Sequence, residues 1–342
     1  MKNRPTIKTI ASDTGYSIAT VSKALNGSRQ VRAATREKII ASAKRYGFEL
    51  NLSGVQLRTG KTYKIAYVVI AADPDNQEWS GVSHGDLLSG ITHALADTPY
   101  QVALHQVSDY QESLELIKTL VINKKADGII FPGTYANDIR IQYLLDTDFP
   151  FVTYGMSSHS RPHAYVDTNN QLIVTISIQR LIAKKHRRIA LLEADRELMN
   201  SVTRHRAYQK SLAQSGLDYD ADLVKFGRLS AAFGREMFFQ LSSLSSPPTA
   251  YYCANEAVAL GVLSGFHARG YVHGRDAVIN ATDDLNISNY FTPPITTCYL
   301  PISRSSYVLG EFMLRLLNGE PVTKLQKLLL PDLIERCPDI LE

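Results

Sequence analysis

The sequence has few of the features on which secreted, membrane-bound or redox proteins depend. Its 342 residues include three cysteines and one tryptophan, and no run approaches the roughly 18 apolar residues of a transmembrane span. Residues 1–30 lack the continuous apolar segment of a secretory signal. Scarce cysteines are typical of a reducing compartment. We therefore expect a cytoplasmic protein with no membrane segment.

Motifs of enzymatic chemistry are also absent. Cys253, Cys298 and Cys337 lack the paired spacing of a metal site, and the histidines are scattered. The nearest approach to a phosphate loop runs from Gly54 to Thr62, but it has one residue too many and no preceding strand. The sequence therefore predicts no enzyme, no metal site and no cofactor.

Basic residues are concentrated at the N-terminus. Through Thr62 there are twelve Lys and Arg against three Asp and Glu, whereas the remainder carries 25 basic and 30 acidic residues. A local charge of +9 beside one of −5 favours a polyanion partner for the N-terminal segment. A basic membrane-surface helix would also need a large apolar face, which this segment lacks.

Residues 6–27 have the pattern of two short helices joined by a turn. Thr6 can cap a first helix with an apolar stripe, and Gly15 suits a turn with positive φ. Ser17 can cap a second helix by accepting a hydrogen bond from the backbone near Ala19 or Thr20. The second helix leaves small, apolar and basic side chains exposed, as a helix that enters a major groove would. An ordinary helical hairpin is the alternative. A third helix is expected from Arg32 to Tyr46, ended by Gly47, before a polar linker.

These motifs, in this order and spacing, resemble the lactose and galactose repressor family of bacterial transcription regulators. The resemblance covers essentially the whole chain, and its most specific segments are Thr6–Lys8, Ala19–Lys23, Leu25–Gly27, Thr35–Lys38 and Leu57–Thr62. It implies that the second helix reads the major groove and that the linker forms a hinge helix on DNA. Leu57 matches the leucine that this family wedges into the minor groove, although an exposed linker residue is the alternative.

Three departures from the family pattern affect DNA recognition. Gly54 replaces an alanine, which costs about 1 kcal/mol in a helix interior, so we expect the hinge to fold only on DNA. Lys23 stands where arginine is frequent, and Arg32 where a capping serine is frequent. The predicted DNA-contacting residues are Thr6, Ser17, Ile18, Ala19, Thr20, Ser22, Lys23, Asn26, Gly54, Val55 and Leu57.

The body from Lys64 onward alternates between strand and helix patterns. Apolar runs at 64–70, 101–107, 127–131 and 149–154, and then at 188–192, 249–253 and 276–280, are separated by helical segments. Such alternation is typical of parallel sheets covered by helices, and about 280 residues favour two lobes. The predicted fold class is thus a small all-α helix-turn-helix head on an α/β, two-lobed body, which by resemblance is of the periplasmic-binding-protein type.

The expected domain organisation follows from this division. It comprises a DNA-binding domain at 1–49, a hinge at 50–63, an N-terminal lobe at 64–162 and 291–325, and a C-terminal lobe at 163–290 and 326–342. The chain is expected to cross between lobes near 158–165, 289–294 and 319–328.

Parallel sheets bind ligands beyond the carboxyl ends of their strands, where several polar residues fall. Asn255 and Asp283 are predicted to bind the effector because of this position, and the family resemblance implies the same role for Arg204 and Asn200. Trp79, in the loop after the first strand, completes the predicted set. Carboxylate, guanidinium and amide groups suit a polyol, and Trp79 could stack on a sugar. Alternatives are a turn-capping Asp283, an Arg204 in a surface ion pair and a Trp79 that packs within the protein. Gly155 replaces a sugar-binding aspartate of many relatives.

The sequence therefore predicts a homodimeric transcriptional regulator that acts as a repressor. It would bind a pseudo-palindromic operator in double-stranded DNA, with an affinity controlled by a mono- or oligosaccharide in the cleft. The chain end at 333–342 has no heptad repeat, which favours a dimer over a tetramer. A sugar-binding transport or receptor protein and a regulator that senses a non-sugar metabolite are the alternatives. Effector identity, its sign and the operator sequence are not predicted.

Overall fold

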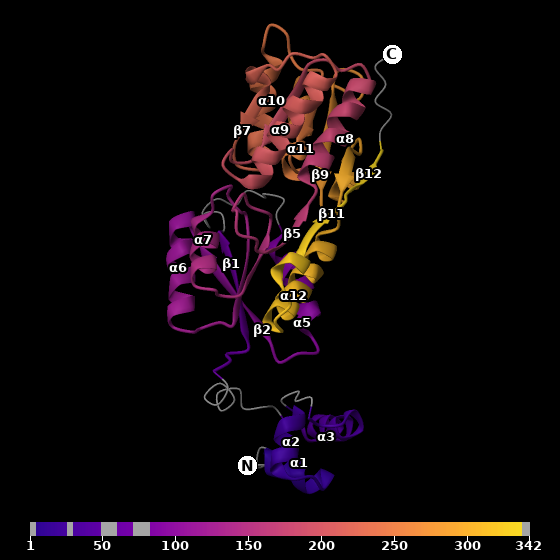
Figure 1. The fold of residues 1–342 in the computed structure, drawn as a ribbon. Helices are drawn as coiled ribbons and strands as arrows, with labels where there is room; N and C mark the ends of the chain where they lie inside the picture. Colours follow the sequence, from indigo (N-terminus) through magenta and orange to yellow (C-terminus); the bar gives the residue numbers. More distant parts are fainter. Residues whose placement is uncertain (1–4, 26–29, 49–59, 71–82, 337–342) are drawn as a thin grey trace. The chain divides into compact units, whose positions relative to one another are not determined.

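The computed structural model describes residues 5–25, 30–48, 60–70 and 83–336 of the chain. These residues form two compact units, 1–63 and 64–342, which we describe separately. Figure 1 shows the helical N-terminal unit and the α/β body.

The N-terminal unit consists of three helices, α1 (Ile7–Thr14), α2 (Ile18–Leu25) and α3 (Ala33–Tyr46). The predicted turn is confirmed: Gly15 has a φ of 73°, and the Ser17 Oγ atom accepts a hydrogen bond from the Thr20 backbone N–H at 3.1 Å. Arg32 precedes α3 without a side-chain capping bond. The helices share one small core of Ile10, Val21, Ala24, Val31, Ile39 and Ala43.

A single carboxylate fastens the end of α1 to the end of α3. Asp13 accepts hydrogen bonds from the hydroxyls of Ser42, at 2.5 Å, and Tyr46, at 3.1 Å, and pairs with Arg45. The bond from Ser42, opposed by slight desolvation and aided by Tyr46 and Arg45, lowers the pKa of Asp13. These contacts hold the C-terminal end of α3 against the end of α1.

The first lobe of the body is built on a parallel sheet in the order β11-β5-β4-β3-β1-β2. Alternate residues of β1 supply both faces: Ile65 and Tyr67 pack towards α5 and α12, whereas Ala66 and Val68 pack towards α6 and α7. This sandwich is visible in Figure 1. The elements are β1 (Lys64–Ile70), α5 (His84–Leu95), β2 (Gln101–Val107), α6 (Tyr110–Ile122), β3 (Gly128–Pro132), α7 (Ile139–Asp146), β4 (Phe151–Tyr154), β5 (Ala164–Thr168), α12 (Ile302–Leu317) and β11 (Gln326–Leu329).

The second lobe repeats this arrangement with a sheet in the order β12-β10-β9-β8-β6-β7, in which only β12 is antiparallel to its neighbour among the described strands. Helices α8 and α9 cover one face, and α10 and α11 cover the other. The elements are α8 (Asn170–Ala183), β6 (Ile189–Glu193), α9 (Met199–Gln214), β7 (Val224–Phe226), α10 (Ala231–Ser242), β8 (Ala250–Cys253), α11 (Glu256–Arg269), β9 (Val278–Asp283), β10 (Thr296–Tyr299) and β12 (Asp332–Ile334).

Sheet membership corrects the expected crossing points. Residues 164–168 and 326–329 were assigned to the C-terminal lobe, but they form β5 and β11, which pair in parallel with each other in the first sheet. Residues 296–299 were assigned to the N-terminal lobe, but they form β10 beside β9 in the second sheet. Each of these strands is paired within the lobe that precedes the crossing. The chain therefore passes to the other lobe only after the strand has ended.

The close crossing of α10 and α11 depends on two glycines. A Cβ atom at Gly234 would lie 2.1 Å from the carbonyl oxygen of Val258, and one at Gly261 would lie 2.0 Å from that of Ala231. Since these neighbours are backbone atoms, a side chain can be accommodated only if the helices separate. The two glycines thus set the distance between the helices that cover this face of the second sheet.

We expect Gly261→Ala to destabilise the body by about 1–3 kcal/mol, because the added methyl group overpacks the helix crossing. Gly85→Ala is the matched control, since Gly85 lies in α5 with open space at its Cβ position. It should be neutral or slightly stabilising. Denaturant unfolding of the full-length variants measures both. Equal stability of the two would contradict the tight crossing.

Candidate functional site

A cavity of about 950 Å³ lies at the carboxyl ends of the strands of both sheets. Its size is suited to a small sugar or metabolite. From the first lobe it is lined by residues that follow β2, β3, β4 and β5, and from the second by residues that follow β6, β7, β8 and β9. The sequence argument that ligand-binding residues follow the strands therefore locates the cavity correctly.

Three arginines line the cavity, Arg196, Arg204 and Arg228; of these Arg204, which projects from α9, is the buried one. It is 8% exposed, so it is not the surface ion pair considered as an alternative. Its Nε donates to Asn170 Oδ1 at 2.7 Å, and its Nη1 donates to the Ala254 carbonyl at 3.2 Å and lies 3.4 Å from Glu193 Oε1. Burial alone would lower the pKa of Arg204, but Glu193 holds it raised. The guanidinium is therefore charged and fixed in direction.

The other described residues predicted for the effector site also line the cavity. Asn255 caps α11 by accepting a hydrogen bond from the Val258 N–H at 3.0 Å, and the Asn200 Oδ1 atom accepts from the Ser201 N–H at 2.8 Å. The predicted residue Trp79 lies outside the described residues. The cavity thus brings together Asn200, Arg204, Asn255 and Asp283.

Asp283 has the turn-capping role that was weighed as an alternative. Its Oδ1 atom accepts hydrogen bonds from the backbone N–H groups of Leu285 and Asn286, and its Oδ2 atom accepts from that of Ser288. The side chain is 1% exposed. The carboxylate therefore organises the loop after β9, and its capacity to accept further bonds from a ligand is small.

Several acidic cavity residues were missed by the sequence reasoning. Asp167 lies one residue before the end of β5 and accepts hydrogen bonds from the Met156 and Thr168 N–H groups, and burial raises its pKa. Glu256 and Asp284 directly follow the predicted residues Asn255 and Asp283. Their position at or shortly after the end of a strand could have identified these residues, but the prediction chose only one polar residue from each segment that it considered.

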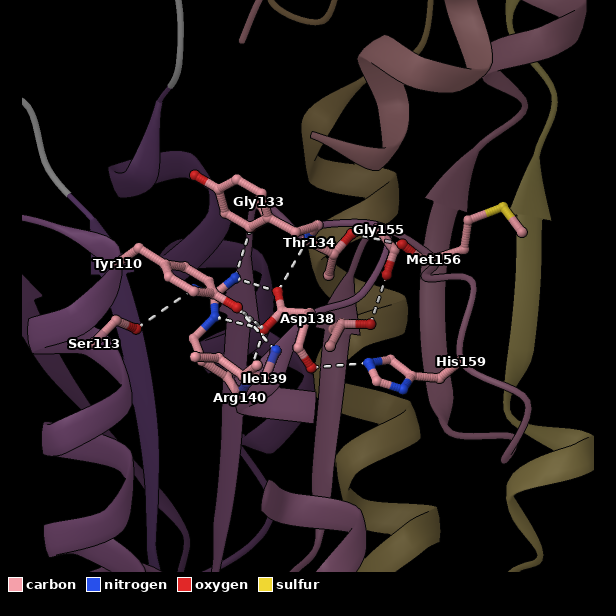
Figure 2. Close-up of polar contacts among 12 residues, drawn as sticks. Tyr110, Ser113, Gly133, Thr134, Asp138, Ile139, Arg140, Gly155, Met156 and His159 are labelled. Atoms are coloured by element: carbon pink, nitrogen blue, oxygen red, sulfur yellow. Dashed lines mark hydrogen bonds and ion pairs between the residues drawn. The ribbon is translucent and has the colours of Figure 1, made fainter. Parts of the chain in front are cut away.

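A buried charge cluster of Arg140 and Asp138 supports the wall of the cavity formed by Gly133, Thr134 and Tyr135. Figure 2 shows Arg140 and Asp138 beside Gly133 and Thr134. The Arg140 Nη2 atom donates to Asp138 Oδ2 at 2.6 Å and to the Gly133 carbonyl at 2.7 Å. Asp138 in turn accepts from the Tyr135 backbone N–H at 3.1 Å. Burial would raise the pKa of Asp138, but the bond from Arg140 holds it lowered.

This wall contacts the second lobe directly. The Thr134 carbonyl accepts a hydrogen bond from the Met199 N–H at 2.9 Å, and Tyr135 forms an isolated antiparallel bridge with Leu198. Both partners lie at the start of α9, the helix that carries Arg204. The backbone thus links the wall formed by Gly133, Thr134 and Tyr135 to the helix that orients the Arg204 guanidinium.

The second site suggested by the sequence is the exposed face of α2. Ser17, Ile18, Ala19 and Lys23 are exposed, whereas Val21 and Ala24 face the core. Lys23 Nζ donates to Gln30 Oε1 at 3.0 Å. The other described residues of the predicted DNA-contacting set are Thr6, which is exposed, and Thr20 and Ser22, which are half-buried. Asn26, Gly54, Val55 and Leu57 lie outside the described residues.

Comparison with known proteins assigns a family to parts of both units. Residues 6–51 match the model of bacterial regulatory proteins of the lacI family, and residues 178–337 match a periplasmic binding protein-like domain. The regulator AglR of Rhizobium meliloti is 30% identical over 85% of this chain and 82% of its own length. The chain belongs to the LacI family.

Relatives of known structure extend this LacI-family match over both units. The transcriptional regulator CelR of Thermobifida fusca is 27% identical over 92% of both chains. A structure of a CelR–cellobiose complex covers 97% of this chain at 25% identity and a TM-score of 0.72. The lac repressor dimer bound to operator has a TM-score of 0.76 over 98% of both chains, and its 22% identity shows the shared fold alone.

This LacI-family chain is therefore a DNA-binding transcriptional regulator with a helix-turn-helix head and a ligand-binding body. Among the described residues, none of the helices is both long enough and apolar enough to span a bilayer.

We expect Arg140→Met to cost about 3–5 kcal/mol of unfolding free energy, because it leaves the Asp138 carboxylate buried without its partner. Lys118→Met is the matched control, since Lys118 forms an ion pair with Glu115 on the surface of α6. Such exposed pairs contribute about 0–1 kcal/mol. Urea unfolding compares the two, and similar losses would contradict a supporting role for the buried cluster.

Proposed function

We propose that this regulator binds a pseudo-palindromic operator as a homodimer and that a sugar in the cavity changes its operator affinity. The observation that carries the proposal is the cavity itself, which is lined from both lobes and holds a fixed, charged Arg204. Two copies of a small reading head match two half-sites of DNA.

The chemistry of the cavity supports a sugar as the ligand. Guanidinium and amide groups donate to hydroxyl and ring oxygens, and carboxylates accept from hydroxyls. Phe226 lines the cavity and offers an aromatic surface to the apolar face of a pyranose. The similarity to CelR, which has been solved with cellobiose, favours the same ligand class.

The mechanism that we propose is linkage between the two sites. Residues 1–49 form the reading head, residues 50–63 the hinge, and the two sheets with their helices the lobes. A ligand that contacts both lobes favours one arrangement of them, and this arrangement changes the spacing of the paired heads. Such coupling typically amounts to about 1–3 kcal/mol.

On the DNA side, we propose that α2 reads bases with one cation and two apolar residues. Lys23 acts as a point charge towards a base or phosphate, whereas Ile18 and Ala19 suit the methyl group of thymine. With so few polar readers, Leu57 and the hinge would supply much of the operator preference through DNA deformation.

We expect Lys23→Ala to weaken operator binding about tenfold or more and to leave sugar affinity unchanged. Lys210→Ala removes the same charge from an exposed position of α9 and is the control. Fluorescence anisotropy on a selected operator, over a series of salt concentrations, measures the affinity and its salt dependence. Equal operator affinity of the two variants would contradict the role of Lys23.

In the cavity we expect Arg204→Lys to weaken sugar binding about tenfold or more without changing operator affinity in the absence of sugar. A lysine retains the charge but loses the geometry that fixes the guanidinium between Asn170 and Glu193. Calorimetry with a panel of sugars, followed by operator titrations with each sugar that binds, measures both steps. Operator affinity that no sugar changes would instead favour a regulator of a non-sugar metabolite.

A further inference from the structure

Two carboxyl groups of the cavity have buried oxygen atoms that no described residue contacts by a hydrogen bond. Glu256 is 1% exposed, yet its Oε1 atom has no hydrogen-bond partner. The Oδ1 atom of Asp284 is likewise buried and without a partner. Both residues line the cavity, one at the start of α11 and the other directly after β9.

These two carboxyl groups form an unfavourable pair in the protein alone. Carboxylate oxygens of Glu256, Asp283 and Asp284 lie within 4.8 Å of one another. Burial, and then the neighbouring Asp284, raises the pKa of Glu256, and burial together with Asp283 raises that of Asp284. Buried acids without partners reduce stability, and strongly perturbed acids in a cavity are frequent at functional sites.

The surrounding groups limit what can occupy this position. The oxygens of Asp283 already accept three backbone hydrogen bonds, so two carboxyl groups remain open. Two side chains supply too few ligands for a calcium ion, which takes 6–8 oxygens. Arg204 is held by Glu193 and Asn170 and does not pair with either group. The two unsatisfied atoms are carboxyl oxygens, which accept hydrogen bonds from the donors of a ligand.

We propose that Glu256 and Asp284 form an acceptor subsite that binds neighbouring hydroxyls of an uncharged sugar and excludes anionic sugars such as uronates and sugar phosphates. Each hydroxyl donates one hydrogen bond to a carboxyl oxygen, and such donors favour the ionised form of the acid, so a neutral sugar opposes the rise in pKa that burial causes. An anionic ligand would add a like charge beside two acids. This inference rests on the proposed sugar-binding function and specifies its ligand class.

The test compares matched sugars on the full-length protein by calorimetry. The probes are glucose with glucuronate, galactose with galacturonate, and cellobiose. We expect the wild-type protein to bind the best neutral sugar at least about tenfold more tightly than its uronate. In Glu256→Gln/Asp284→Asn we expect neutral sugars to bind about tenfold more weakly and the preference over the uronate to disappear.

Asp195→Asn is the matched control, because Asp195 lines the same cavity but is exposed. Its preference for the neutral sugar should stay close to that of the wild type, since solvent screens an exposed charge. Thermal unfolding separates binding from folding. The raised pKa values mean that the folded state retains protons that the unfolded chain releases, so the stability of the wild type falls as the pH rises. Relative to the wild type, the melting temperature of the amide variant should therefore rise between about pH 5 and about pH 8.

Three results would overturn the subsite. They are a double variant with an unchanged preference, a wild-type protein that binds a uronate as tightly as its neutral sugar, and sugar binding that EDTA abolishes and calcium restores. An unchanged preference in the double variant would contradict only the role of Glu256 and Asp284 and would not affect the proposed sugar-binding function. A wild-type protein that binds none of the neutral sugars would contradict the sugar effector as well.

Discussion

The direction of parallel strands is the constraint from which the rest of the body follows. Because each strand of a parallel sheet ends at the same edge, the loops that leave those ends are brought together without any special sequence signal. In this protein two such sheets present their carboxyl ends to one cavity. The polar residues of the site are therefore far apart in the chain; Asn255 and Asp283 lie at strand ends, whereas Arg204 reaches the cavity from α9.

The buried charged residues of the cavity fall into two groups: those that have a partner within the protein and those that lack one. Arg140 with Asp138, and Arg204 with Glu193, are buried pairs in which each arginine also donates to a backbone carbonyl. Glu256 and Asp284 lack such compensation. A protein retains an uncompensated buried acid at a cost in stability, and that cost is offset when a ligand supplies the missing donors. The pairs hold the cavity open, whereas the unpaired acids define what it accepts.

The sequence alone predicted the parts of this architecture that depend on local patterns. The turn at Gly15, the cap at Ser17 and the strand at 64–70 follow from backbone preference and hydrophobic periodicity, and the structure has them where they were expected. The crossing points could not be placed as well, since β5, β10 and β11 are short and are held by ladder partners distant in sequence.

The cavity residues show the same division. Arg204 was recognised by the family resemblance and Asn255 by its position after a strand. The role of Asp283 depends on the backbone N–H groups of the loop after it, which a sequence pattern does not position. Glu256 and Asp284 became candidates only once burial showed which of adjacent polar residues is left without a partner. Sequence position thus identifies the edge of a sheet where a ligand binds. The hydrogen bonds of the folded protein then distinguish Asp283, which organises the loop, from Asp284, which is left to bind the ligand.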